Sequence, residues 1–292
     1  MMTMRNLASP LVLRQVLAEN GFRFTKSLGQ NFLVDENVLD SIISGAEING
    51  ESCVLEIGPG FGTLTQRLCM HAKKVVAVEI DSDVIPVLKE STANFENIRV
   101  INADIMKTDI AALISDEFGS QKVKVCANLP YYITTPIISS LIKPSLPISD
   151  ITVMIQKEVA ERLAASPGGK DYGALSVMVG YRAEPELITV VPPSAFMPQP
   201  KVESAVIRLN LRSTPPVDLI SEKVFEDVVK GAFALRRKTL VNSLANGGTL
   251  GLSKDEIIKI LSVAGIDGKR RGETLSMQEF AAIANEISRC GG

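Results

Sequence analysis

The 292-residue chain has few of the residues that build most metal and redox centres. It contains no tryptophan and one histidine, His71, which supplies neither a histidine metal site nor a catalytic triad. Its four cysteines, Cys53, Cys69, Cys126 and Cys290, form no CxxC pair, and three of them lie in apolar or helical surroundings. This usage is typical of buried thiols in a reducing compartment. We therefore expect no metal site and a cytoplasmic location.

Long apolar runs and an excess of charge are also absent. No run approaches the roughly 20 apolar residues of a membrane span, and the N-terminus has no apolar signal segment with a small-residue cleavage site. The net charge of −2 argues against a protein that coats nucleic acid non-specifically, but it allows a local basic face. The length allows one large domain and one small one. We expect a monomer without a membrane partner.

Strand and helix patterns alternate through the middle of the chain. Short apolar runs predict strands at 53–57, 75–80, 98–102, 123–128 and 151–155, with helical patterns between them. This alternation predicts a Rossmann-like α/β fold, in which helices cover both faces of a mostly parallel sheet. Ligands of such sheets bind at the carboxyl ends of the strands. Gly58, Glu79, Asp104 and Asn128 all lie at or just beyond such ends, so one crevice can hold all four.

The character of the sequence changes near residue 213. Residues 1–213 form the expected catalytic domain, which begins with a helical and loop extension over 1–50. After a Ser-Thr-Pro-Pro sequence at 213–216, strand patterns stop and amphipathic helices follow, two of them opened by Ser-x-x-Glu capping boxes. Residues 214–292 are therefore expected to form a smaller, all-helical domain.

The first predicted strand ends in a glycine-rich loop. The run Gly58-Pro59-Gly60-Phe61-Gly62 follows Ile57, and an apolar helix pattern begins at Leu64. Glycine lets the backbone approach a ligand and adopt positive φ, and the helix N-terminus adds N–H donors. A dinucleotide loop needs a third glycine where Thr63 stands, so this spacing, preceded by Glu56, favours S-adenosylmethionine over a nicotinamide cofactor. The alternative is a purely structural turn.

Two acidic residues follow neighbouring strands. Glu79 ends the second strand, where a carboxylate can accept hydrogen bonds from both ribose hydroxyls of a cofactor. Asp104 follows the third strand and can accept from the amino group of an adenine ring. The alternatives are a solvated strand-end acid for Glu79 and a turn or cap residue for Asp104. Beside the glycine loop, both are expected to bind the cofactor.

The strongest motif, Asn128-Leu129-Pro130-Tyr131, ends the fourth strand. The lone pair of an exocyclic amine is delocalised into its ring, so methylation needs acceptors that hold the two amine hydrogens. The Asn128 side-chain oxygen and a backbone carbonyl can do this, while Pro130 stiffens the turn and Tyr131 offers a stacking face. No strong base is required, and much of the rate should come from positioning. An ordinary turn into a helix is the alternative.

Residues outside this motif provide candidate contacts to a nucleic acid. Phe196 lies in a proline-rich loop of a chain with only 5% aromatic residues, and we expect it to stack on the base opposite Tyr131. Core packing is the alternative for Phe196. Basic residues that can grip RNA phosphates are Arg23, Lys26, Lys201 and the triplets Arg236-Arg237-Lys238 and Lys269-Arg270-Arg271. The alternative for the triplets is a set of solvated helix ends.

Together these motifs resemble the ribosomal RNA adenine dimethyltransferase family, specifically its bacterial small-subunit (16S) enzymes. The matching segments are 28–33, 56–62, 78–79, 102–104, 128–131, 156–160 and 196–202. The likeness runs from about residue 20 to residue 290, and the first and last segments are specific to this family.

The resemblance implies a reaction and a set of roles. It implies that S-adenosyl-L-methionine is bound by Asn31, Leu33, Gly58, Gly60, Glu79, Asp104 and Asn128. It also implies that Asn128, Leu129 and Tyr131 serve the target adenine, with Phe196 on its other face. The implied reaction places two methyl groups on N6 of each of two adjacent adenosines, in a hairpin near the 3′ end of 16S rRNA. The implied partner is that RNA within an immature small subunit, during ribosome biogenesis.

Three alternatives stay open. The large-subunit rRNA methyltransferases that give macrolide resistance share most of these motifs, but they usually have isoleucine in place of Leu129. An assembly or transcription factor that binds nucleic acid without needing catalysis is the second. A nicotinamide oxidoreductase is the third, opposed by the glycine spacing and by the lack of a hydride-transfer histidine.

Overall fold

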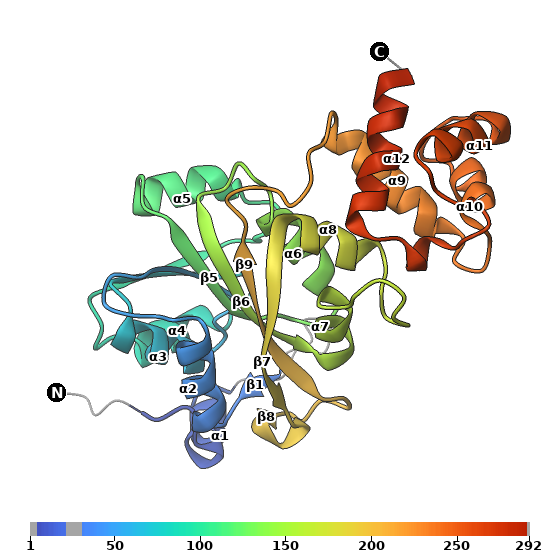
Figure 1. The fold of residues 1–292 in the computed structure, drawn as a ribbon. Helices are drawn as coiled ribbons and strands as arrows, with labels where there is room; N and C mark the ends of the chain where they lie inside the picture. Colours follow the sequence, from blue (N-terminus) through green and yellow to red (C-terminus); the bar gives the residue numbers. More distant parts are fainter. Residues whose placement is uncertain (1–4, 22–30, 291–292) are drawn as a thin grey trace. The chain divides into compact units, whose positions relative to one another are not determined.

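The computed structural model describes residues 5–21 and 31–290. Within this part the chain divides into two compact units (Figure 1). The first comprises the residues up to Ala160 together with Pro185–Leu211, and the second comprises Glu161–Glu184 together with the residues from Arg212 onward. The second unit thus includes Glu161–Glu184, which precede residue 213 in sequence.

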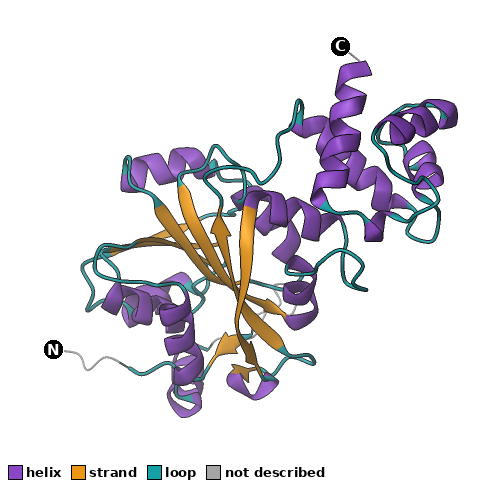
Figure 2. Cartoon of the chain, viewed as in Figure 1, coloured by secondary structure: helices purple, strands orange, loops and turns teal. Residues whose placement is uncertain are grey.

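A sheet, whose strands are orange in Figure 2, forms the centre of the first unit. It has seven strands in the order β4-β3-β2-β5-β6-β9-β7. Its strands are β2 (Cys53–Ile57), β3 (Lys74–Glu79), β4 (Ile98–Asn102), β5 (Val123–Asn128), β6 (Ile148–Gln156), β7 (Ala183–Val191) and β9 (Ser204–Leu211). The pairs from β4 to β6 are parallel, and β9 runs antiparallel to β6. The predicted mostly parallel, Rossmann-like sheet is confirmed. Because the chain turns back from β4 to β5, the strand order reverses between β2 and β5, which is where such sheets bind ligands.

The helices of the first unit are α1 (Pro10–Glu19), α2 (Glu36–Gly45), α3 (Thr63–His71), α4 (Ile85–Ser91), α5 (Ile110–Phe118) and α6 (Thr134–Leu141). All five residues of β2 are buried, as expected of a strand with helices on both faces. Asp35 caps α2 by accepting hydrogen bonds from the N–H groups of Asn37 and Val38. The cap fixes the start of α2, which follows closely after Phe32 and Leu33.

The described part of the second unit is helical, apart from turns, the 3₁₀ segment Gly272–Thr274 and the first two residues of β7. It contains α8 (Ala174–Arg182), α9 (Glu222–Ala234), α10 (Leu240–Asn246), α11 (Lys254–Val263) and α12 (Met277–Cys290), and α7 (Lys157–Leu163) runs into it. Phe225 and Phe280 are fully buried at its centre. The capping boxes are confirmed at Ser253 and at Ser276, where each serine hydroxyl accepts from the backbone of the third following residue.

A two-stranded sheet joins the N-terminal region to the proline-rich segment. Strand β1 (Phe32–Leu33) pairs antiparallel with β8 (Phe196–Met197), and the Val34 N–H donates to the Ala195 carbonyl at 2.8 Å. The ring of Phe32 lies 4.5 Å from that of Phe61 in the glycine loop, measured between centroids. The pairing therefore holds β1 against the glycine loop.

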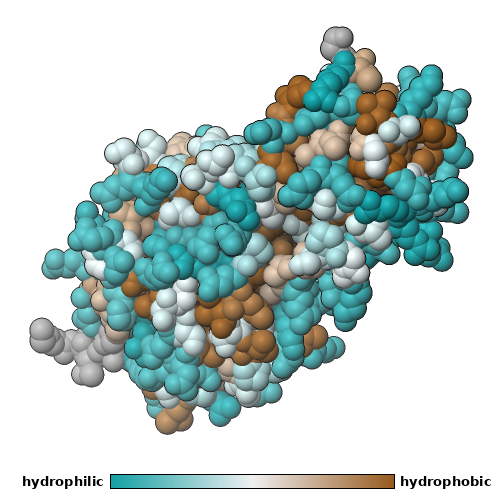
Figure 3. Space-filling model, viewed as in Figure 1, coloured by the Kyte–Doolittle hydropathy of each residue, from teal (hydrophilic) through white to brown (hydrophobic). Residues whose placement is uncertain are grey.

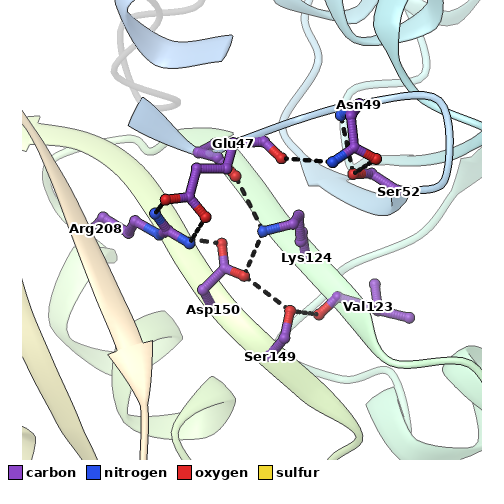
Figure 4. Close-up of polar contacts among 9 residues, drawn as sticks. Glu47, Asn49, Ser52, Val123, Lys124, Ser149, Asp150 and Arg208 are labelled. Carbon is purple, nitrogen blue, oxygen red and sulfur yellow. Dashed lines mark hydrogen bonds and ion pairs between the residues drawn. The ribbon is translucent and has the colours of Figure 1, made fainter. Parts of the chain in front are cut away.

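An ion network at the amino end of β5 fixes the chain between α2 and β2 to the sheet (Figure 4). The Lys124 ammonium donates to the Ala46 carbonyl at 3.1 Å and to the Asp150 carboxylate at 2.7 Å. Arg208 in β9 pairs with the Glu47 carboxylate at 2.8 Å. Asp150 is buried, and the neighbouring cations of Lys124 and Arg208 compensate its carboxylate. The end of α2 is thus tied to β5, β6 and β9.

The visible surface is mostly hydrophilic, with smaller apolar patches (Figure 3). Among the described residues, no helix has the length and apolar character needed to cross a membrane, and no cluster of side chains suits a metal ion. Cys53, Cys69 and Cys126 are buried free thiols, as predicted, whereas Cys290 is exposed. His71 ends α3 at the surface.

Candidate active site

A cleft opens at the carboxyl ends of β2, β3, β4 and β5. It brings together ten of the residues that the sequence singles out: Asn31, Leu33, Gly58, Gly60, Glu79, Asp104, Asn128, Leu129, Pro130 and Tyr131. They come from β1 and the residue before it, from the glycine loop, from the ends of β3 and β5, and from the loops after β4 and β5. The topology therefore assembles them, since parallel strands end at one edge of the sheet.

The glycine loop has the backbone that its sequence predicts. Gly58, Gly60 and Gly62 have φ values of 69°, 57° and 98°, in the left-handed region that favours glycine. At Gly60 a Cβ atom would lie 2.8 Å from the Phe32 ring, which is too close for any other residue. Glycine is needed there so that β1 can pack on the loop. The loop thus presents its backbone to the cleft from beneath β1.

The Glu79 carboxylate is fixed by backbone donors. One oxygen accepts from the Gly60 N–H at 3.0 Å, and the other accepts from the Asp81 N–H at 2.9 Å. Burial raises the pKa of Glu79, and the N–H bonds from Asp81 and Gly60 oppose that rise. A carboxylate oxygen can accept more than one hydrogen bond, so both Glu79 oxygens can accept a further bond from the cleft. Glu79 therefore couples the glycine loop to the end of β3.

Asp104 combines a turn role with a place in the cleft. One of its oxygens accepts from the Met106 N–H at 3.0 Å, and the other lies 3.5 Å from the exposed Lys107 ammonium. The turn alternative therefore describes part of its role. Its side chain lines the cleft nevertheless.

The Asn128 amide has a defined orientation. Its NH₂ group donates to the backbone carbonyl of Asn31 at 3.0 Å, which leaves the side-chain oxygen as the free acceptor. Among the described residues, no donor is bound to the Leu129 carbonyl oxygen either. The Leu129 N–H donates to the Met154 carbonyl at 3.1 Å, which fixes this part of the backbone to β6. The motif thus offers two acceptors, as methylation of an exocyclic amine requires.

Tyr131 is held by a residue that the sequence reading did not single out. Its hydroxyl lies 2.6 Å from the hydroxyl of Ser204, the fully buried first residue of β9. Burial raises the pKa of Tyr131, partly offset by the Ser204 hydrogen bond, so the phenol stays neutral near pH 7. No local signal predicts this contact, because the two residues lie 73 positions apart in sequence.

Glu56 is a buried acid directly below the glycine loop, and it lines the cleft. Burial raises the pKa of Glu56 to about 8, and the nearby Thr65 hydroxyl opposes this only in part. Glu56 Oε2 and the Thr65 hydroxyl oxygen are both buried, and neither has a hydrogen-bond partner among the described residues. Glu56 is therefore protonated near pH 7 in the folded protein.

Phe196 does not present the stacking face that the sequence predicts. Its ring is 2% exposed, it packs in the core with Leu33 and Val191, and it is absent from the cleft lining. Pairing of β8 with β1 turns the ring inward, because Phe196 is the partner of Leu33. Core packing, the alternative reading, describes this structure.

The two basic triplets lie side by side in the second unit. The Leu240 N–H donates to the Arg270 carbonyl at 2.6 Å, and Glu273 lies 4.0 Å from Arg236 and 3.9 Å from Arg271. Arg270 is held by Glu279.

The remaining basic candidates differ in what they contact. The side chains of Arg237, Lys238 and Lys269 are exposed and make no hydrogen bond or ion pair with a described residue. Lys201 is exposed in the first unit, and Arg23 and Lys26 lie outside the described residues.

Comparison with known proteins places this arrangement in a family. Residues 21–283 match the family model described as "Ribosomal RNA adenine dimethylase". The chain is 48% identical to "Ribosomal RNA small subunit methyltransferase A" of Alkaliphilus oremlandii, over 98% of this chain and 99% of that protein.

Two solved structures share the fold. The dimethyladenosine transferase of Plasmodium falciparum is 27% identical with a TM-score of 0.76, over 89% of this chain and 98% of that one. The 23S rRNA methyltransferase ErmE is also 27% identical, with a TM-score of 0.67, over 88% of this chain and 100% of that one. The fold is therefore shared with an enzyme that acts on the large-subunit RNA.

The buried Glu56 carboxyl should make the stability of the fold depend on pH. Between pH 4.5 and 8 the folded state keeps a proton that the unfolded state releases, so this group lowers stability as the pH rises. Glu56→Gln removes that titration. Its unfolding free energy, relative to the wild type, should therefore rise with pH, with a slope of at most about 1.4 kcal/mol per pH unit in the middle of this range. Urea unfolding at pH 5, 6.5 and 8 measures it, with exposed Glu51→Gln as the control. Parallel pH profiles for Glu56→Gln and the wild type would contradict the assignment.

Proposed function

This chain belongs to the ribosomal RNA adenine dimethylase family, and we propose that its substrate is the RNA of the small ribosomal subunit. The chain is an S-adenosylmethionine-dependent rRNA adenine N6,N6-dimethyltransferase. The proposal about the substrate is supported by the name of the relative from Alkaliphilus oremlandii, with which the chain aligns over nearly its whole length. As targets we propose two adjacent adenosines in a hairpin near the 3′ end of 16S rRNA, in immature subunits in the cytoplasm.

The cleft fits S-adenosylmethionine as the methyl donor, which supplies an electrophilic methyl group on a sulfonium. We assign the ribose hydroxyls to Glu79, whose oxygens keep acceptor capacity, and the adenine amino group to Asp104. The left-handed glycines at 58 and 60 let the backbone approach the donor closely. Asn31, directly before β1, and Leu33 in β1 cover it. Ile80 and Ile105 add apolar walls beside the proposed adenine position.

For the acceptor, the observation that carries the proposal is the orientation of Asn128. Because its NH₂ group is bound to the Asn31 carbonyl, its oxygen can accept one hydrogen of the adenine amine. The Leu129 carbonyl can accept the other hydrogen, which draws the nitrogen toward a tetrahedral geometry with its lone pair available. Methyl transfer would break the sulfonium–methyl bond and leave a neutral thioether, and the nitrogen, now cationic and acidic, would release one proton to water. Tyr131 supplies a stacking face on one side of the base.

We predict which ribosomal subunit is labelled. Wild-type protein, methyl-labelled S-adenosylmethionine and either small or large subunits that lack adenine methylation are incubated separately. Label should enter the small-subunit RNA and be recovered as N6,N6-dimethyladenosine after nuclease digestion. Label confined to the large-subunit RNA would instead support the activity of the related 23S rRNA methyltransferase.

Asn128→Ala should abolish methyl transfer and leave cofactor affinity largely intact. The substitution removes an acceptor that acts on the amine in the transition state, and such losses appear in kcat. Single-turnover transfer to small subunits measures the first effect, and calorimetry with S-adenosylmethionine measures the second. Asn246→Ala is a matched control, since this exposed amide bonds only within α10. Normal turnover by Asn128→Ala would refute the catalytic role of this amide.

We propose that the free cations of the two triplets bind RNA phosphates, with Lys201 as a further contact in the first unit. Arg237, Lys238 and Lys269 support this best, because their side chains have no described partner. Arg270 instead has a structural role as well, since Glu279 and the Thr274 carbonyl hold its guanidinium. The Arg236 guanidinium donates to the backbone carbonyls of Lys170 and Tyr172, in the loop between α7 and α8.

This difference gives a paired prediction. Arg237→Gln with Lys238→Gln should weaken RNA binding and reduce the slope of log affinity against log salt by about 2, with little change in thermal stability. Arg270→Gln should mainly lower the melting temperature, because it leaves Glu279 without its cation. Filter binding across a salt series and thermal unfolding measure the two effects. An unchanged salt slope in the Arg237, Lys238 double variant would exclude these residues from the RNA contact.

A further inference from the structure

The turn between β5 and α6 holds two consecutive tyrosines in different environments. The Ile133 N–H donates to the Pro130 carbonyl at 3.2 Å, so Tyr131 and Tyr132 occupy the centre of a closed turn. The Thr134 hydroxyl donates to the same carbonyl at 3.2 Å. Both tyrosines line the cleft, but only Tyr131 is anchored, through Ser204.

Tyr132 stands apart from the other three tyrosines of the chain. The hydroxyls of Tyr131, Tyr172 and Tyr181 each have a hydrogen-bond partner, and the last two rings are buried. The Tyr132 hydroxyl has no described partner, and its side chain is 56% exposed. Among the described residues, Tyr132 is the one large aromatic side chain that is exposed. Packing within the protein therefore does not explain this ring.

We propose that Tyr132 stacks on the nucleobase next to the target adenosine. This inference rests on the proposed function, because it extends the acceptor site by one nucleotide. A base that enters the cleft leaves the stack of its neighbours, and each neighbour then exposes one face. An aromatic ring at the mouth of the cleft restores a stacking contact for one neighbour, whatever its identity. The turn geometry keeps the ring directly beside the anchored Tyr131.

The proposal assigns Tyr132 to RNA binding and not to the chemical step. Such a contact is made equally in the ground state and in the transition state, so its loss raises KM and leaves kcat nearly unchanged. The ring carries the contact, so Phe should replace Tyr. The cofactor site lies deeper in the cleft, around Glu79 and the glycine loop, and its affinity should not depend on Tyr132.

Steady-state methyl transfer to unmethylated small subunits tests this. Tyr132→Ala should raise the KM for subunits roughly 5- to 150-fold, the range of one lost base–aromatic stack. Tyr132→Phe should restore KM to within about threefold of the wild type, and the affinity for S-adenosylmethionine should be unchanged in both variants. Leu187→Ala is the matched control, because Leu187 is an exposed apolar residue of β7 outside the cleft lining.

Three results would overturn the proposal. The first is an unchanged KM in Tyr132→Ala, and the second is equal impairment of the Ala and Phe variants, which would assign the effect to the hydroxyl. The third is weakened S-adenosylmethionine binding with an unchanged KM for subunits, which would assign the ring to the cofactor site. Failure of the proposed function is distinguishable, since the wild-type protein itself would then transfer no methyl group to small subunits.

A fluorescent reporter gives an independent measurement. Because the chain has no tryptophan, Tyr132→Trp introduces a single indole, and Leu187→Trp places the same reporter away from the cleft. Protein-free, unmethylated 16S rRNA is the probe, and filter binding verifies that both variants bind it. Emission from position 132 should be quenched as RNA binds, and emission from position 187 should not. Equal responses at the two positions would contradict a stacking contact at Tyr132.

Discussion

The hydrogen bond from the Asn128 amide to the Asn31 carbonyl connects the two halves of the proposed reaction site. Asn31 precedes β1, which covers the glycine loop, while Asn128 ends β5 and faces the acceptor side of the cleft. This contact turns the NH₂ end of the amide toward Asn31, so its oxygen is the end that an adenine amine would meet. If β1 moved away from the loop, the amide would lose the partner that sets its orientation. The cover over the methyl donor and the orientation of the Asn128 amide therefore both depend on the short segment formed by Asn31 and β1.

The rest of the first unit keeps that segment in place from both sides. Pairing with β8 holds β1, and Gly60 lets the Phe32 ring pack against the loop where a Cβ would collide. After β1 the chain enters α2, whose start is capped by Asp35 and whose end is tied to the sheet by Lys124. The ion network lies at the opposite end of β5 from the cleft. Its buried charges stabilise the arrangement only as a set, because removal of one leaves another uncompensated.

The sequence predicts the sheet and the cleft well because both follow from local patterns. Continuous apolar runs mark buried strands, and residues at their ends meet at one edge, so Gly58, Glu79, Asp104 and Asn128 come together. Contacts set by distant pairing are not predicted. Phe196 is turned into the core by β1, and Tyr131 is anchored by Ser204 across 73 residues. The proximity of the two basic triplets likewise depends on the packing of α9, α10 and the loop before α12. In all three cases the surroundings of the side chain are set by residues that are distant in sequence.

In the proposed reaction, Asn128 holds the target amine through its side-chain oxygen, while its own NH₂ group stays bound to the Asn31 carbonyl. The most direct measurement is a crystal structure of the protein with S-adenosylhomocysteine and an RNA that carries the target adenosines. We predict that the Asn128 oxygen lies within about 2.7–3.2 Å of adenine N6, with the Asn128 NH₂ group still bound to the Asn31 carbonyl. A target adenine bound in the cleft with N6 contacting neither Asn128 nor the Leu129 carbonyl would contradict it.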